Sequence, residues 1–209
     1  MKHPLGHPAE PWAVDQSEHL VRPASQGFAH LDKYHFKKHP YQVSALYRFF
    51  IEVVKREIHT CPLVIPLSLP PHETVTVSAH GLIYAMVLFY RRLCALPVSQ
   101  TPVICAERDR EGRPCFTLSL PYFPESKFCL NEQDYGVRLV TRLGEICHFD
   151  FSCFTAPTLK LYFSLRRFRS TDFAVYADSG VNLDSFARAA LQDAEVLIQA
   201  DRRQDCRTG

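Results

Sequence analysis

The chain has 209 residues, of which 46% are hydrophobic, and a formal net charge of +2 at pH 7. This composition is enough for one ordinary domain with a packed core and additional terminal segments. It contains no run of roughly eighteen apolar residues, which excludes an apolar membrane-spanning helix. Its Lys and Arg clusters are pairs or triples beside apolar segments, so we interpret them as solvated element ends and expect no nucleic-acid partner.

Residues 1–40 contain five prolines and six histidines with little apolar periodicity. This pattern predicts an extended arm or a loosely packed cover. The first residues include Pro4, Glu10 and Asp15 in place of the apolar core of a secretion signal. We therefore expect a cytoplasmic protein.

The chain from residue 41 to about 58 shows apolar positions three and four residues apart, which predicts an amphipathic helix. Cys61 to Leu69 is an apolar run interrupted by prolines, and proline cannot donate to a strand ladder, so we expect an edge strand. A second strand is predicted over 74–78. A long apolar helix follows from about His80 to Ala95, and Pro97 ends it.

Residues 101–108 and 114–120 form a hairpin pattern, in which Gly112 suits a turn that needs a positive φ. A helix beginning near Gly136 is predicted over 134–145, with a turn at Gly144. Two strands near 146–154 and 158–168 follow.

A last helix is predicted over about 183–200, with one continuous apolar face. The order of elements fits a two-layer α/β sandwich, with helices on one side of a mixed, mainly antiparallel sheet. We divide the chain into an N-terminal arm (1–40), an α/β domain (41–169) and a C-terminal extension (170–209).

Over residues 41–169 this succession resembles the histidine-kinase-like (GHKL) ATPase domain family, in which a glycine-led helix precedes the last two strands. In that family the long central helix carries a magnesium-binding asparagine in a pattern like Asn-Leu-x-x-Asn-Ala. By our register Val87 and Arg91 stand where the two asparagines would be. Valine offers no ligand to magnesium and arginine repels it.

The family also has an Asp-x-Gly-x-Gly motif, whose aspartate accepts from the adenine amino group. This chain has Ser119-Leu-Pro121-Tyr-Phe-Pro124 there, with no aspartate or glycine. Asp134 and Gly136 retain part of the last motif, where the start of a helix binds phosphate. The resemblance therefore implies a remnant of a nucleotide pocket at Arg91, Pro121, Asp134 and Gly136, with no bound cofactor.

Other chemistries find little support in the sequence. The chain has neither a P-loop nor a GxSxG nucleophile elbow. Its eight cysteines include no CxxC pair, so we expect free thiols. Cys147 and His148 are adjacent, but neighbouring strand residues point to opposite faces, so we expect no metal site.

We therefore expect a non-catalytic GHKL-like domain that serves as a protein-binding or regulatory module in bacterial signalling. The alternatives are a divergent nucleotide-binding kinase or ATPase of the anti-sigma or histidine-kinase type, with Asp109, Glu125 or Asp134 in other roles, and an unrelated α/β domain. The expected partner is another protein or a second copy of the chain. The expected contact residues are those of the last helix: Phe186, Leu191, Leu197 and Ile198.

Overall fold

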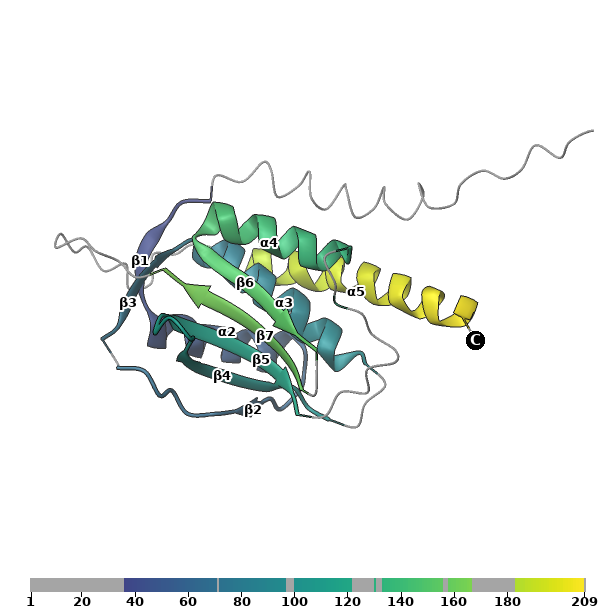
Figure 1. Ribbon diagram of the computed structural model, residues 1–209, viewed down its shortest axis with the longest axis horizontal. Helices are drawn as coiled ribbons and strands as arrows, with labels where there is room; N and C mark the ends of the chain where they lie inside the picture. The colour runs from purple at the N-terminus through teal and green to yellow at the C-terminus, as the bar shows by residue number, and fades with distance from the viewer. Residues whose placement is uncertain are drawn as a thin grey trace, which may run out of the picture.

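The computed structural model describes residues 36–70, 72–96, 100–121, 130, 133–155, 158–166 and 183–208. A five-stranded sheet has the order β2-β4-β5-β7-β6, and its only parallel pair is β2 with β4. The strands are β2 (Leu63–Val64), β4 (Val103–Arg108), β5 (Pro114–Leu120), β6 (Phe149–Phe154) and β7 (Leu159–Leu165). Figure 1 shows these strands in front of the helices, which lie on one face of the sheet.

The predicted fold class is confirmed: a mixed, mainly antiparallel sheet carries helices on one face. These helices are α2 (Val43–Glu57), α3 (Ala79–Cys94) and α4 (Tyr135–Cys147). Among the described residues, no helix has the length and apolar character needed to cross a membrane.

The edge strand β2 lies where the prolines of its segment indicated, at one end of the sheet. Tyr47 of α2 holds it in place, because its hydroxyl donates to the carbonyl oxygens of Ile65 (2.7 Å) and Ile104 (3.0 Å). The hairpin between β4 and β5 is also as predicted, and Gly112 has φ +74°.

The boundary expected at residue 40 falls inside a strand. β1 (His39–Gln42) pairs antiparallel with β3 (Thr74–Val77) in a separate two-stranded sheet. Backbone bonds join this small sheet to the rest of the fold, since the amide of Ser78 donates to the carbonyl of Cys147 (3.0 Å). Residues 1–35 lie outside the described part, so the extended arm stays a prediction.

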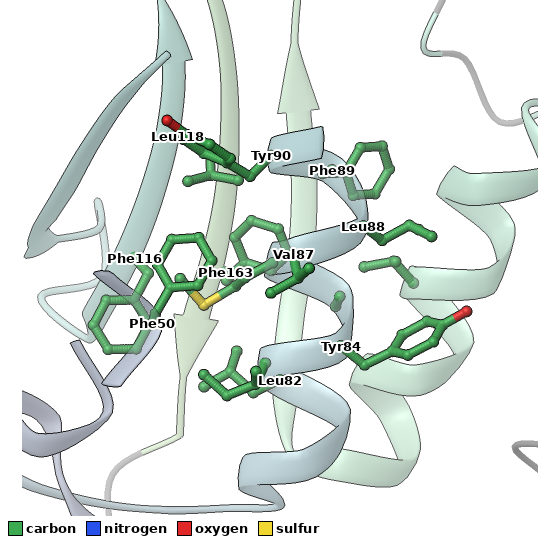
Figure 2. Close-up of a cluster of buried hydrophobic side chains, with 14 of the residues drawn as sticks. Phe50, Leu82, Tyr84, Val87, Leu88, Phe89, Tyr90, Phe116, Leu118 and Phe163 are labelled. Atoms are coloured by element: carbon green, nitrogen blue, oxygen red, sulfur yellow. The ribbon is translucent and has the colours of Figure 1, made fainter. Parts of the chain in front are cut away.

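Helix α3 is buried around most of its circumference. On the side of the sheet, Val87 packs into the core with Phe116 and Phe163, as Figure 2 shows. Tyr84 points away from these two rings in the same view and is also fully buried. A helix that is apolar all round has to be covered on both sides, so α3 needs a second partner besides the sheet.

That second partner is the last helix, α5 (Leu183–Thr208), which packs along α3. Phe186, Leu197 and Ile198 are buried and Leu191 is partly buried. Phe186 and Leu197 therefore pack in the chain's own core, and the expectation that this apolar face meets another chain stays a prediction. The helix is also longer than the predicted 183–200.

The prediction of a turn at Gly144 is wrong, because α4 continues to Cys147. The chain reverses at His148, which has φ +66°. Gly144 serves a different purpose. A Cβ atom at this position would lie 2.5 Å from the carbonyl oxygen of Phe149. Glycine is thus needed where the start of β6 approaches the helix.

Gly144→Ala is expected to lower the free energy of unfolding by up to about 2 kcal/mol. The clash with a backbone carbonyl costs about 1–3 kcal/mol, while the better helix propensity of alanine returns about 1 kcal/mol. Thr141→Ala, at an exposed position of the same helix, is the matched control and should be neutral or slightly stabilising. Urea denaturation measures both; equal stability of the two variants would show that the close approach carries no cost.

Candidate functional site

The candidate site lies at the start of α4, where the resemblance led us to expect the remnant of a phosphate-binding motif. Asp134 is the N-cap residue, and its Oδ1 accepts a hydrogen bond from the amide of Val137 at 2.8 Å. Aspartate is favoured here because it satisfies an amide that has no partner within the helix and because its charge suits the positive end of the helix. The start of the helix therefore already holds an anion from its own chain.

Arg92, near the end of α3, completes the site. Its two terminal nitrogens donate to the two carboxylate oxygens of Asp134, both at 2.9 Å, in a bidentate pair. The same guanidinium donates to Asp201 of α5 at 2.9 and 3.2 Å. The Arg92 side chain is only 1% exposed, against 12% for Asp134 and 34% for Asp201. Arg92 thus ties together three helices that are far apart in sequence.

Gly136 makes this arrangement possible. A Cβ atom on Gly136 would lie 2.6 Å from Nη1 of Arg92 and 3.2 Å from Cδ1 of Leu197. The guanidinium and the leucine therefore lie directly against the first turn of α4. The glycine that the sequence suggested for phosphate approach admits an arginine side chain here.

Among the contacts described, the cluster consists of one cation and two carboxylates, a net negative set. Burial acts to lower the pKa of Arg92, but the hydrogen bonds and charges of Asp134 and Asp201 outweigh it and raise the pKa. Arg92 therefore stays charged, and both of its carboxylate partners are held on it. A further anion would have to compete with these carboxylates for the same donors.

The register that assigned Arg91 and Val87 to the pocket requires a correction of one residue for the arginine. Arg91 turns toward α5, where its Nε donates to Glu195 at 2.6 Å. Val87 points to the sheet (Figure 2). The arginine of α3 whose side chain reaches the start of α4 is Arg92. Two sequence patterns could have indicated the Arg92–Asp201 pair, which we missed. Arg92 follows the apolar Leu88 by four residues and Asp201 follows the apolar Leu197 by four, so each charged residue lies on the same face of its helix as an apolar one.

The remaining predicted residues do not join this cluster in the contacts described. Pro121 is exposed at the end of β5, and its carbonyl accepts from the hydroxyl of Thr158 at 3.3 Å. Asp109 caps the hairpin turn, where it accepts from the amides of Glu111 and Arg113. Glu125 lies outside the described residues.

Further polar contacts attach α5 to the domain. The hydroxyl of Tyr84 donates to Asp193, and its pKa is raised by burial and by that carboxylate. At the beginning of α5, Phe186 packs against His80 with ring centroids 4.6 Å apart and the rings tilted by 59°. Arg56, at the end of α2, bonds Asp184 at 2.6 Å.

The cysteines in the described part are free, as expected. Burial raises the pKa of Cys115 and of Cys147 to about 12, so both stay as thiols at neutral pH. Within the same part of the chain, no cluster of three or more His, Cys, Asp or Glu side chains is arranged to hold a metal ion.

Comparison with known proteins gives similarity at the level of structure. No protein-family model matches the chain, and no curated protein matches it. The histidine kinase AdeS of Acinetobacter baumannii is similar with a TM-score of 0.50 at 9% identity, over 73% of this chain and 77% of that one. Full-length ShkA in complex with AMPPNP (TM-score 0.49, 14% identity, 86% and 44% covered) and the catalytic domain of ThkA (0.44, 13%, 63% and 96%) are more distant.

The chain therefore has the fold of histidine-kinase catalytic domains at very low sequence identity. Likeness at this level establishes the fold and nothing finer. What the domain does has to be argued from the site itself.

Arg92→Ala is expected to lower the free energy of unfolding by about 3–5 kcal/mol, because it leaves Asp134 and Asp201 without their shared cation in a largely buried place. The neighbouring variant Arg91→Ala removes a pair whose side chains are 33% and 46% exposed and should cost about 1 kcal/mol or less. Urea denaturation measures both losses, which can be compared directly if the slope of the unfolding free energy against urea concentration is the same in the two variants. Equal losses in the two variants would mean that the ion cluster is not a structural centre.

Proposed function

We propose that this chain is a non-catalytic relative of histidine-kinase-type ATPase domains that has lost nucleotide binding. It acts as a protein-binding or regulatory module in bacterial signalling, in the cytoplasm. The observation that carries the proposal is the Arg92–Asp134–Asp201 cluster at the start of α4. In the family that the fold resembles, the corresponding helix start and the central helix serve phosphate and magnesium.

The residues at this position do not fit magnesium-bound ATP. Magnesium requires oxygen ligands with near-octahedral geometry, and Arg92 supplies five N–H donors, a positive charge and no acceptor. The carboxylates of Asp134 and Asp201 have suitable oxygens, but they are engaged with Arg92. No step of an ATP-dependent reaction follows from this arrangement.

The phosphate groups would also meet unfavourable surroundings. The amide of Val137, which an anion at the helix start would use, already donates to Asp134. Leu197 lies against the same turn, so α5 stands beside the place where phosphate would approach. Binding would require the departure of α5 and of a capping carboxylate, which together give α4 its ordered start.

The alternative is a divergent kinase or ATPase. It would need a carboxylate free to accept a proton or bind a metal. Asp109 caps a turn and pairs with Arg113 at 2.8 Å, and Asp134 caps α4 and pairs with Arg92. These structural roles favour the non-catalytic proposal, in which the domain binds a protein partner or a second copy of itself.

Mg-ATP is expected to leave the thermal unfolding midpoint of the full chain unchanged at millimolar concentration. A functional site at about 100 times its Kd would add about 2.7 kcal/mol of stability, which a thermal-shift titration resolves easily. The catalytic domain of an ATP-binding histidine kinase in the same buffer is the positive control, and magnesium chloride alone is the blank.

A saturable rise of the midpoint with Mg-ATP would contradict the proposal. If Gly136→Ala or Asp134→Ala also abolished that rise, the divergent-kinase alternative would replace it. Both variants need a check of folding by circular dichroism, because both positions support the start of α4.

A further inference from the structure

We propose that the surface of α3 covered by α5 is a docking site for an acidic amphipathic helix of a partner protein, and that α5 is its resident occupant. The α5-docking surface is defined by His80, Tyr84, Arg91 and Arg92 of α3, together with Arg56 at the end of α2. This inference rests on the proposed protein-binding function and names the site and the class of partner.

Charge complementarity identifies the chemistry of the partner. Four carboxylates of α5 meet donors of the docking surface: Asp184 on Arg56, Asp193 on Tyr84, Glu195 on Arg91, and Asp201 on Arg92. All of the donors in these contacts belong to the domain and all of the acceptors to α5. A partner helix has to present carboxylates at the same spacing, in particular the eight residues that separate Asp193 from Asp201, about 12 Å along a helix.

The apolar part of the contact requires small side chains. Ala187, Ala190 and Ala194 are fully buried and follow one another at three- and four-residue spacing, so the backbone of α5 can approach α3 closely. Phe186 and Leu197 add larger groups on either side of this stripe. A partner with bulky residues in place of the alanines would be held too far from α3 for the polar contacts to form.

The same composition makes α5 replaceable. Alanine buries little apolar surface compared with the leucine and phenylalanine that fill the opposite side of α3. Three of the four carboxylates are at least one-third exposed, with values of 43% for Asp184, 46% for Glu195 and 34% for Asp201. The pairs of Asp184 and Glu195 have arginine partners that are 51% and 33% exposed, so they add little to stability, whereas Asp201 meets the buried Arg92. On the proposal, α5 opens before the rest of the domain does, which hydrogen exchange tests.

A labelled peptide with the sequence of residues 183–203 is the probe for the docking site, and full-length protein is the receptor. Fluorescence anisotropy measures its binding to wild type and to the variant Asp193→Ala/Glu195→Arg, whose own α5 is weakened at Tyr84 and repelled by Arg91. The peptide is expected to bind the variant at least tenfold more tightly than wild type, because the resident helix competes less. Arg91→Glu introduced into that variant is the matched control and should reduce binding again.

Absence of peptide binding to the folded variant would overturn the proposal and make α5 a permanent core helix. Light scattering on wild type tests whether the occupant is a second copy of the chain. A stable dimer that exchanges α5 between copies would overturn the partner-helix assignment. Neither outcome depends on nucleotide, whereas a positive Mg-ATP titration would overturn the proposed function whatever the peptide does.

Hydrogen exchange on unmodified full-length protein needs neither variants nor peptide. The amides of α5 are expected to exchange through an opening that leaves α3 and α4 protected. Exchange of α5 only together with α3, at the rate of global unfolding, would contradict the inference.

Discussion

The structure depends on covering α3 on both of its sides. This helix is apolar around most of its circumference, so a single sheet cannot bury it. The sheet covers Val87 and its neighbours (Figure 2). Helix α5 covers the side that includes Tyr84, whose hydroxyl donates to Asp193. An appended helix has therefore become a structural requirement of the domain, and its position brings Leu197 and Asp201 to the start of α4.

Arg92 links this requirement to the question of function. A buried guanidinium needs acceptors for its donors, and Asp134 and Asp201 provide them to its two terminal nitrogens from α4 and α5. The same three groups occupy a place where the related fold holds an anionic ligand. A helix start that is capped by a carboxylate and covered by α5 has little capacity for phosphate, and this is the ground on which we propose protein recognition in place of nucleotide binding.

The sequence predicted the elements well where local patterns decide them. The apolar period of α2, the glycine turn between β4 and β5 and the prolines beside β2 each led to the observed element. It failed where a contact over a long sequence distance decides. Gly144 looked like a helix end because its close approach to Phe149 cannot be read from neighbouring residues. Arg92 was missed for the same reason, because its partners lie 42 and 109 residues away.

Removal of α5 tests the central claim most directly. A chain ending at Arg166 would expose the outer side of α3 and leave Arg92 without Asp201. Compared with the full chain in urea denaturation, it should be less stable by several kcal/mol, and the 183–203 peptide added in trans should restore part of the loss. An unfolding midpoint equal to that of the full chain would contradict the account, because α3 would then need no second cover.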